Sequence, residues 1–385
     1  MPRFFASLRD DSRCAAVGFD FAARRRRGIS AAMKIAVLLS GGVDSSVAMR
    51  LLLQAGHRDV TAFYLKVWLE DELSRLGDCP WEEDLRFARA ACEQAGVPLR
   101  VVSLQSEYFA RVVEYTLAEL RAGRTPSPDI FCNQQIKFGA FFDRVNEPFD
   151  KVASGHYAQV RERGGAFRLF RAPDPVKDQT YFLSRLRQEQ MARVLFPIGH
   201  LWKAEARKQA EEFDLPNKAR PDSQGICFLG KIPYNEFIRH YLGEKRGDIV
   251  EAGTRRVLGE HKGFWFHTIG QRSGLGLSGG PWYVVGKEIE ANVIVVSHAE
   301  QREPQARATF RAVEPSWIHR AVEDDEENLT CKLRHGPNMI ACRAKRRADG
   351  AFDVELVKPD SGVAPGQFCV FYSGEECLGS GRIEL

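Results

Sequence analysis

Residues 40–46 read Ser-Gly-Gly-Val-Asp-Ser-Ser, and this stretch decides the fold. It lies between an apolar run, Ile35 to Leu39, and an amphipathic segment, Val43 to Gly56, so it is predicted to join a buried strand to a helix. Two glycines let the backbone approach an anion closely, the serine hydroxyls can donate hydrogen bonds to it, and a helix start offers unpaired N–H groups. The stretch therefore predicts a phosphate-binding loop, with a plain glycine turn as the alternative.

Asp44 is an unusual residue beside an anion, because its carboxylate would repel the anion. It fits the site if it holds a magnesium ion or caps the helix. The loop also lacks the lysine of the Gly-Lys-Ser/Thr nucleotide loop, so it belongs to a different class of phosphate-binding loop.

The chain around this loop alternates short apolar runs with amphipathic segments. Apolar runs at 34–39, 60–68, 99–104 and 151–154 are separated by predicted helices at 43–56, 82–96, 107–123 and 134–145. Such alternation predicts an α/β fold with a mainly parallel sheet, helices on both faces, and ligands at the carboxyl ends of the strands.

The pattern changes after Tyr157. A hairpin is predicted at 158–161 and 166–171, followed by helices at 181–195 and 203–213. A glycine pattern at 274–279 is assigned to a loop, because it neither follows a strand nor opens a helix. Beyond Ala306, short strands with turn signals predict a small antiparallel β-barrel. We therefore divide the chain into an N-terminal extension (1–32), an α/β domain (33–230), a central domain (231–303) and a C-terminal barrel (304–385).

The composition is that of an ordinary globular protein, with 44% hydrophobic and 28% charged residues over 385 positions. No apolar run approaches the roughly 18 residues of a membrane-spanning helix, so no membrane partner is expected. The net charge of +4 lies wholly in residues 1–32, which hold seven arginines and three aspartates. Bulk charge therefore gives no sign of nucleic-acid binding by the remainder, and any such surface must be built from local patches.

The nine cysteines form no C-x-x-C pair and no Cys/His spacing that suits zinc, so we predict a reducing compartment and no metal site of this kind. Two of them have unusual surroundings. Cys132 follows a proline-rich stretch that runs up to a predicted helix N-terminus, where unpaired amides favour a thiolate. Cys227 lies in a polar segment flanked by Lys218, Arg220 and Lys231. Each is a candidate nucleophile, with a buried packing cysteine as the alternative.

Further motifs add a resemblance to a known family. The phosphate loop is similar to that of the ATP pyrophosphatases. It is followed in order by residues 123–133 (GRTPSPDIFCN), 154–157 (SGHY), 177–183 (KDQTYFL), 222–230 (DSQGICFLG), 267–272 (HTIGQR), 281–285 (PWYVV) and 365–372 (PGQFCVFY). Together the motifs resemble the tRNA-specific 2-thiouridylases, the MnmA and mitochondrial Mtu family, over about residues 33–385. The resemblance implies an ATP-pyrophosphatase (PP-loop) domain and a transferase that adenylates O2 of the wobble uridine in tRNA, then replaces it with sulfur from a cysteine persulfide.

The resemblance also assigns roles to residues. Cys227 would carry the persulfide, Cys132 would release the sulfur and leave a transient Cys132–Cys227 disulfide, and Asp129 would be the nearby acid or base. ATP, with Mg²⁺, would bind Leu38, Leu39, Ser40, Gly41, Gly42, Val43, Asp44, Ser45, Leu65 and Gly155. The tRNA would contact Ser127, Pro128, Asp129, His156, Lys177, Asp178, Gln179, Arg334, His335 and Gln367. The Arg334-His335 pair replaces an Arg-aromatic pair of the family, and many relatives carry Asn in place of Ser127. A cysteine desulfurase or a sulfur-relay protein is implied as the upstream sulfur donor.

Two segments, 76–85 and 262–266, resemble plant and algal organellar relatives. They favour a mitochondrial or chloroplast targeting role for residues 1–32, although the three aspartates there are unusual in a transit peptide. The alternative is a disordered tail on a cytoplasmic protein. Two other functions also stay open: an adenylating ligase or amidotransferase without sulfur chemistry, and a catalytically silent RNA-binding homologue.

Overall fold

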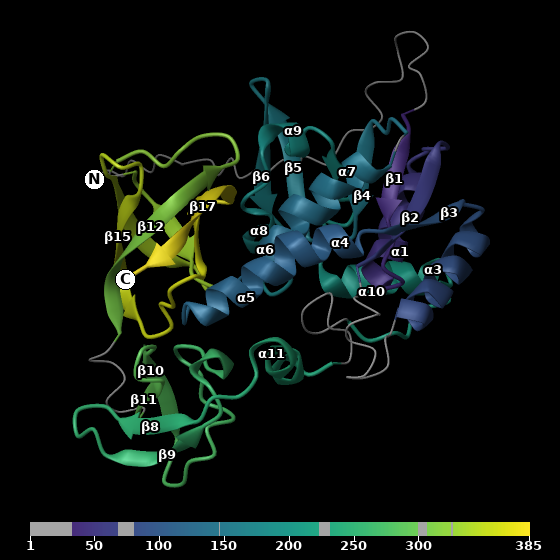
Figure 1. Cartoon of the computed structure of the whole chain (residues 1–385). Coiled ribbons are helices and arrows are strands. Elements are labelled where there is room, and N and C mark those ends of the chain that lie inside the picture. Colours follow the sequence, from purple (N-terminus) through teal and green to yellow (C-terminus); the bar gives the residue numbers. More distant parts are fainter. Residues whose placement is uncertain (1–32, 68–80, 146, 223–231, 299–305, 325) are drawn as a thin grey trace, which may run out of the picture.

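The computed structural model describes residues 33–67, 81–145, 147–222, 232–298, 306–324 and 326–385. The Arg-rich stretch 1–32 and Cys227 lie outside the described residues, so what the sequence suggests for them stays a prediction. The described chain forms an α/β domain, a small central domain and a C-terminal antiparallel barrel, which confirms the predicted fold class (Figure 1). No described helix is both long enough and apolar enough to span a bilayer.

Five parallel strands form the sheet of the α/β domain, in the order β3-β2-β1-β4-β7. They are β1 (Ile35–Leu38), β2 (Val60–Lys66), β3 (Leu99–Ser103), β4 (Lys151–Ser154) and β7 (Val194–Leu195). Leu38 is in register with Phe63 of β2 and with Ser154 of β4. The carboxyl ends of three neighbouring strands therefore meet at one edge of the sheet.

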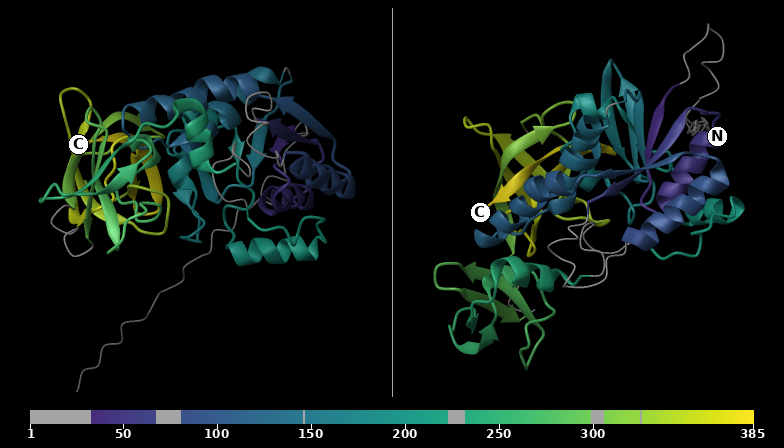
Figure 2. Two further views of the ribbon diagram at one scale, coloured as in Figure 1. Left: turned by 60° about the horizontal axis from the view of Figure 1, so that its bottom comes forward. Right: turned by 45° about the vertical axis from the view of Figure 1, so that its right-hand side comes forward.

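Helices cover both faces of this sheet, because the side chains of β1 alternate between two cores. Ala36 and Leu38 pack on one face, whereas Ile35 and Val37 pack on the other. The first face carries α4 (Gln105–Tyr108), the π-helical turn η2 (Phe109–Val113), α5 (Glu114–Arg121), α6 (Pro128–Phe131), the π-helical segment η3 (Cys132–Ala140) and α7 (Phe141–Arg144). The second face carries α1 (Val43–Gln54) and α3 (Trp81–Ala95), and α10 (Lys203–Glu212) packs beside α1 (Figure 2).

The single helix predicted at 181–195 is wrong. The chain instead forms two short helices, α8 (Thr180–Leu183) and α9 (Gln188–Met191), followed by the strand β7. Val194 and Leu195 pair with Val152 and Ala153 at the edge of the parallel sheet. Pairing with this edge therefore overrides the helical pattern of the sequence.

The central domain is a small mixed sheet with one helix. Helix α11 (Tyr234–Leu242) is followed by β8 (Gly247–Glu251), β9 (Val257–His261), the short turn η4 (Phe264–Phe266), β10 (Trp282–Glu288) and β11 (Val293–His298). The strands lie in the order β10-β11-β8-β9. The glycine pattern at 274–279 lies in a loop, as predicted.

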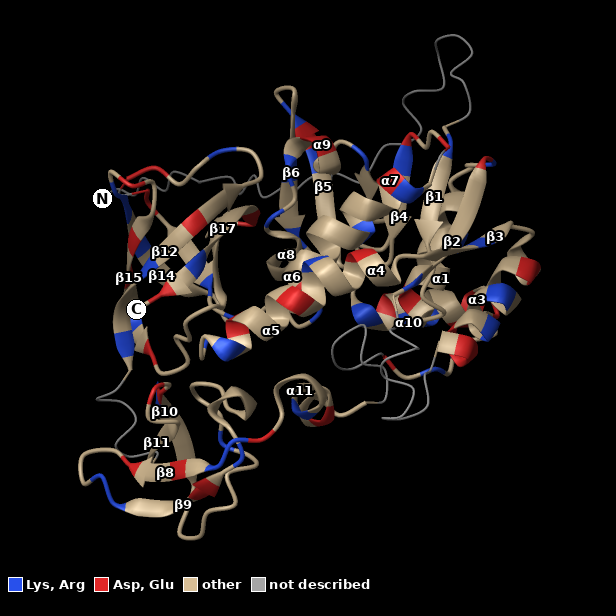
Figure 3. Cartoon of the chain, viewed as in Figure 1, with Lys and Arg blue, Asp and Glu red and all other residues tan. Residues whose placement is uncertain are grey.

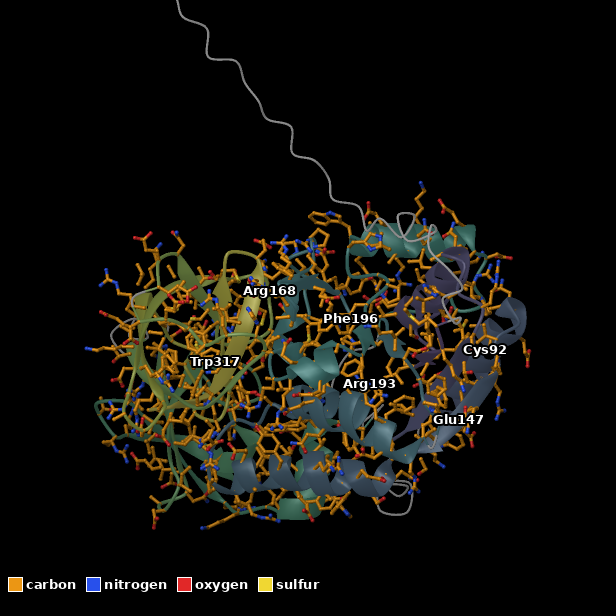
Figure 4. The ribbon with its side chains drawn as sticks, turned by 90° about the horizontal axis from the view of Figure 1, so that it is seen from above. Cys92, Glu147, Arg168, Arg193, Phe196 and Trp317 are labelled. Carbon is orange, nitrogen blue, oxygen red and sulfur yellow. The ribbon has the colours of Figure 1, made fainter. Side chains whose placement is uncertain are left out.

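Antiparallel strands close the C-terminal barrel. They are β12 (Arg307–Trp317), β13 (Leu329–Lys332), β14 (Ile340–Arg346), β15 (Phe352–Asp360), β16 (Phe368–Ser373) and β17 (Glu376–Glu384), and β12 pairs with both β15 and β17. Trp317, which is labelled in Figure 4, packs against the rings of Phe352 and Phe371. The predicted hairpin, β5 (Ala158–Arg163) and β6 (Ala166–Arg171), joins the same sheet through β17. The α/β domain and the barrel therefore share one continuous sheet.

A fully buried ion pair, Asp178 with Lys332, lies where the α/β domain meets the barrel. Neither side chain has exposed surface, and Nζ of Lys332 lies 2.7 Å from Oδ2 of Asp178. The carboxylate also accepts a hydrogen bond from Oγ1 of Thr180 at 2.9 Å and lies 3.5 Å from Nε of Arg171. Buried charges are tolerated only when they are paired and hydrogen-bonded, so these contacts join the two domains in a defined position.

Replacing Lys332 alone should be strongly destabilising. We expect Lys332→Met to lower the free energy of unfolding by about 3 to 5 kcal/mol, because it leaves the buried carboxylate of Asp178 without its nearest cation. Urea unfolding would measure the change. The double variant Asp178→Asn, Lys332→Met removes both charges and should recover much of the loss. A Lys332→Met protein as stable as wild type would contradict the prediction.

Candidate active site

The predicted phosphate-binding loop lies at the carboxyl edge of the sheet, between β1 and α1. Gly41 has a φ of +76°, which favours glycine, and a Cβ there would lie 2.2 Å from the carbonyl oxygen of Asp84. Gly42 precedes the helix in an extended conformation, and no side chain caps the first turn. The start of α1 therefore offers backbone N–H groups to an anion.

The serine hydroxyls brace this loop. Oγ of Ser45 and Oγ of Ser46 donate to the carbonyl oxygen of Gly42 at 3.0 and 3.1 Å. The backbone N–H of Ser40 donates to Oγ of Ser45 at 3.2 Å. The sequence predicts instead that these hydroxyls point toward an anion, so they would have to rotate to contact one.

Other residues predicted to hold ATP come to the same edge. Gly155 follows β4, and a Cβ there would lie 2.6 Å from the backbone nitrogen of Ser45. Only glycine allows the two backbones to approach this closely. Leu65 lies near the end of β2, the strand beside β1. Leu38 and Leu39 are buried directly before the loop. The predicted ATP residues therefore lie around one end of the sheet.

A cluster of opposite charges adjoins the loop. Nζ of Lys203, at the start of α10, lies 2.8 Å from both carboxylate oxygens of Asp44 and 2.8 Å from Oδ1 of Asp222. Asp222 also pairs with Lys177 at 2.6 Å and with Arg207. Partial burial opposes ionisation of Asp222, but the hydrogen bonds from Lys177 and Lys203 outweigh it and lower the pKa of this carboxyl. The cluster joins the phosphate loop to the residue that directly precedes the segment of Cys227.

The second predicted centre, Asp129 and Cys132, lies on the helix that begins at Pro128. The prediction that Cys132 stands at a helix N-terminus is wrong, because α6 starts at Pro128 and places Asp129 in its first turn. The N–H of Cys132 is bonded within the helix, and the residue is only 2% exposed in the main core. Unpaired helix amides therefore do not explain an activated thiol at Cys132, and the thiol needs to be uncovered before it can react. Ser127, just before the helix, donates its backbone N–H to the hydroxyl of Tyr115 at 3.2 Å.

The turn that contains Lys177 and Gln179 connects the two centres. Lys177 reaches Asp222 in the charge cluster, and Oε1 of Gln179 accepts the backbone N–H of Tyr157 at 2.9 Å. The hydroxyl of Tyr157 in turn donates to Oδ1 of Asp44 at 2.8 Å. Burial, followed by the charge of Asp44, raises the pKa of Tyr157, so its hydroxyl stays a donor.

Helix α8 follows this turn and contacts the helix that carries Cys132. The carbonyl oxygen of Phe182 accepts a hydrogen bond from Nδ2 of Asn133, the neighbour of Cys132, at 3.2 Å. His335 of the barrel is exposed and stacks on the ring of Phe182, with ring centroids 4.7 Å apart. The structure thus places the phosphate loop, the turn at 177–179 and the helix that carries Cys132 in one connected region.

Three residues predicted to contact tRNA are buried: Pro128 at the start of α6, His156 and Asp178. His156 is buried, its Nδ1 shares a hydrogen bond of 2.8 Å with Oγ of Ser154, and its ring packs against Phe138 and Phe196. Burial lowers the pKa of His156 well below its ordinary value, so the ring stays neutral. The Asp178 side chain is fully buried in its ion pair. In this structure none of these three side chains is available to contact RNA, because each packs inside the protein.

Two further residues predicted to contact tRNA, Arg334 and Gln367, belong to the barrel. Arg334 forms a two-pronged ion pair with Asp360, at 3.0 and 2.9 Å, and its side chain is 48% exposed. Gln367 is half-buried and follows Gly366, which packs against Arg124 in the loop before Asp129. Gln367 therefore lies near the loop that leads to Asp129 and Cys132. His335, the neighbour of Arg334, stacks on Phe182.

The sequence does not single out several residues that hold the phosphate loop. Nδ2 of Asn217 donates to the carbonyl oxygen of Gly41 at 2.8 Å and Nη1 of Arg220 donates to it at 3.1 Å. Both precede Asp222 in the chain, so their closeness to the DSQGIC motif is a signal that could have found them. Lys203 has no such signal, because only the fold brings it to Asp44.

The comparisons with known proteins agree with this architecture. Family models match three consecutive parts of the chain: a tRNA methyl transferase HUP domain over residues 33–231, a tRNA methyl transferase PRC-barrel domain over 235–298 and an aminomethyltransferase beta-barrel domain over 307–383. A tRNA-specific 2-thiouridylase MnmA of Parabacteroides distasonis is 46% identical over 359 residues, which cover 91% of this chain and 99% of that protein. This chain belongs to the tRNA-specific 2-thiouridylase family.

Other thiouridylases match it similarly. That of Porphyromonas gingivalis is 44% identical over 363 residues, covering 91% of this chain and 99% of its own. Among solved structures, the U34-tRNA thiolase NcsA from Methanococcus maripaludis is 17% identical, with a TM-score of 0.33, and the match covers 51% of this chain and 62% of that one. Membership of the thiouridylase family confirms the resemblance found in the motifs, whereas the organellar branch stays a prediction.

Proposed function

We propose that this protein makes 2-thiouridine in tRNA. ATP binds at the loop after β1, O2 of the wobble uridine attacks the α-phosphate, and pyrophosphate leaves. Sulfur from a persulfide on Cys227 then replaces the adenylated oxygen, and AMP leaves. The observation that carries the proposal is the chain of contacts from Asp44 through Tyr157 and Gln179 to α8, whose Phe182 contacts the neighbour of Cys132. One substrate atom can be activated and then attacked only if both centres serve the same cavity.

The residues at the loop fit a nucleotide polyphosphate. The uncapped start of α1 offers N–H groups to phosphate oxygens, and Gly41 and Gly155 let neighbouring backbone segments pack closely around the loop. The described residues contain no group of three His, Cys, Asp or Glu side chains that could hold a metal ion alone. Mg²⁺ would therefore arrive with ATP and use Asp44 as a protein carboxylate, since this ion is commonly bound by one or two carboxylates and substrate phosphates.

The sulfur step divides one difficult displacement into two easier ones. The Cys132 thiolate attacks the inner sulfur of the Cys227 persulfide, forms a Cys132–Cys227 disulfide and expels hydrosulfide. Hydrosulfide attacks C2 of the adenylated uridine, AMP leaves with the oxygen, and Asp129 accepts the released proton. An external thiol reduces the disulfide, and a cysteine desulfurase or a sulfur-relay protein restores the persulfide.

The test is to incubate the protein with ATP, a sulfur source and tRNA, and to identify nucleosides by mass spectrometry. We expect 2-thiouridine together with AMP and pyrophosphate. Pyrophosphate without 2-thiouridine would favour an adenylating ligase or amidotransferase. The absence of both products would favour a silent RNA-binding protein.

We also expect tRNA binding to weaken with salt. Lysine, arginine and acidic residues are interspersed over the visible elements of all three domains, so contacts to RNA phosphates must come from local groups (Figure 3). Each such contact releases counterions, which makes log K fall linearly with log salt. Fluorescence anisotropy between about 50 and 200 mM salt should show a loss on the order of tenfold or more. An affinity that does not change with salt would contradict binding through phosphates.

A further inference from the structure

The loop that leads to Asp129 and Cys132 lies at the junction of three domains. It begins at Gly123, after helix α5, and continues to Ser127 before α6. In Figure 1 and in the right-hand view of Figure 2, the C-terminal end of α5 points to the place where the barrel and the central domain approach each other. Contacts made there can set the position of the helix that carries both predicted reactive residues.

The central domain contacts the start of this loop. Nζ of Lys287, on β10, donates a hydrogen bond to the carbonyl oxygen of Gly123 at 3.1 Å. Gly123 has a φ of +71°, and a Cβ there would lie 2.1 Å from Cδ1 of Ile289 on the same edge of the central domain. Lys287 is half-buried at the junction, and this burial lowers its pKa to about 8. A cation is also favourable near the carboxyl end of a helix.

The barrel contacts the next residues of the same loop. The backbone N–H of Thr125 donates to the carbonyl oxygen of Pro365 at 2.8 Å. Gly366 has a φ of +90°, and a Cβ there would lie 2.8 Å from Cβ of Arg124. Arg124 is itself held by Glu119 of α5. Residues 123–125 of the loop are therefore contacted by both the central domain and the barrel.

The junction is not completely filled. A cavity of about 290 Å³ lies there, lined by Gly123, Arg124, Lys287, Ile289, Asp360 and Pro365 among others. A space of this size lets the loop shift unless specific contacts hold it. The hydrogen bond from Lys287 is therefore a contact on which the placement of the loop depends.

We propose that Lys287 is a positioning residue for thiolation: through Gly123 it makes the place of Asp129 and Cys132 depend on how the central domain is docked. The inference rests on the proposed function. A tRNA that spans the central domain and the barrel holds both sides of the loop, so the reactive residues are aligned when tRNA is bound. Neither Lys287 nor Gly123 needs to touch the reacting atoms.

The first test is Lys287→Met, which keeps the length of the side chain and removes its donor. We expect kcat for thiolation to fall about tenfold or more, since small misplacements of reacting groups cost this much, while the Kd for tRNA stays within twofold. The matched control is Lys262→Met, which removes an exposed lysine of the same domain and should leave kcat unchanged. A Lys287→Met enzyme with wild-type kcat, or one that loses only tRNA affinity, would overturn the inference.

A second pair of variants guards against a simple folding defect. Gly123→Ala should lower kcat because its Cβ meets Ile289, and Ile289→Ala in the same chain should restore part of the loss. If the double variant is no better than Gly123→Ala at equal thermal stability, the contact does not position the loop. Wild-type protein in the same assay separates the two proposals: without 2-thiouridine from wild type the proposed function fails, whereas an active wild type with an equally active Lys287→Met defeats only this inference.

Discussion

Cys132→Ser is expected to abolish 2-thiouridine formation, by on the order of a thousandfold or more, while AMP and pyrophosphate are still released. A serine hydroxyl is nearly the same size as the thiol, so the packing around position 132 should change little. It cannot attack a persulfide sulfur as a thiolate does, so the step that releases sulfur is lost. In the proposed mechanism, ATP is cleaved at the loop after β1, and this step does not use the thiol. Nucleoside mass spectrometry and pyrophosphate release, measured on the same samples, would separate the two steps.

The matched control is Cys92→Ser. Cys92 is as buried as Cys132, at 2% exposure, but it lies on α3 at the outer side of the α/β domain (Figure 4). Burial, followed by the charge of Glu93, raises the pKa of the Cys92 thiol to about 12, so this cysteine is unreactive at neutral pH. Its replacement should leave thiolation intact. Thiolation that persists in Cys132→Ser, or disappears in Cys92→Ser, would show that Cys132 is not the nucleophile.

The α/β core is predictable because its signals are local. Glycines end the apolar run of β1 and the amphipathic pattern of α1 follows at once, so strand, loop and helix can be assigned from a few neighbouring residues. The segment 181–195 also carries a helical apolar pattern, but strand pairing with β4 decides the conformation of its end. Val194 becomes a strand because β4 presents an open edge, and that edge exists only after the sheet has formed.

The site follows the same division. Motifs identify residues that lie within one loop, such as Gly41 and Asp44, but they place Cys132 before a helix start, whereas the helix begins at Pro128. They do not reveal which charged residues form ion pairs inside the protein. Asp178 resembles a tRNA contact in the sequence, yet its partner Lys332 lies 154 positions further along and encloses it. Conversely, Lys203 is 159 positions from Asp44 and enters the site only through folding.

Lys203→Met is expected to lower ATP cleavage about a hundredfold, because removing one preorganised donor from a site of developing charge typically costs this much. Three cations, Lys177, Lys203 and Arg207, surround two carboxylates, Asp44 and Asp222, and Lys203 is the group that contacts both carboxylates. Without it Asp44 faces the incoming phosphates with its charge uncompensated by the protein. Thiolation should fall in parallel with AMP release, because in the proposed mechanism sulfur transfer requires an adenylated uridine. This parallel loss distinguishes Lys203→Met from Cys132→Ser, in which only the sulfur step fails.

The control for Lys203 lies on the same helix. Lys208 is 78% exposed and pairs only with Glu212 among the recorded ion pairs of the described chain, so Lys208→Met removes the same charge from α10 without touching the loop. It should cleave ATP at the wild-type rate. Lys203→Arg keeps the charge but changes its shape and reach, so it should fall between wild type and Lys203→Met. Because Lys203 is mostly buried, the melting temperature of each variant should be measured beside its activity. A stable Lys203→Met protein that cleaves ATP within a few-fold of wild type would mean that Asp44 is neutralised by another cation, and Mg²⁺ brought by the nucleotide would then be the group that offsets its charge.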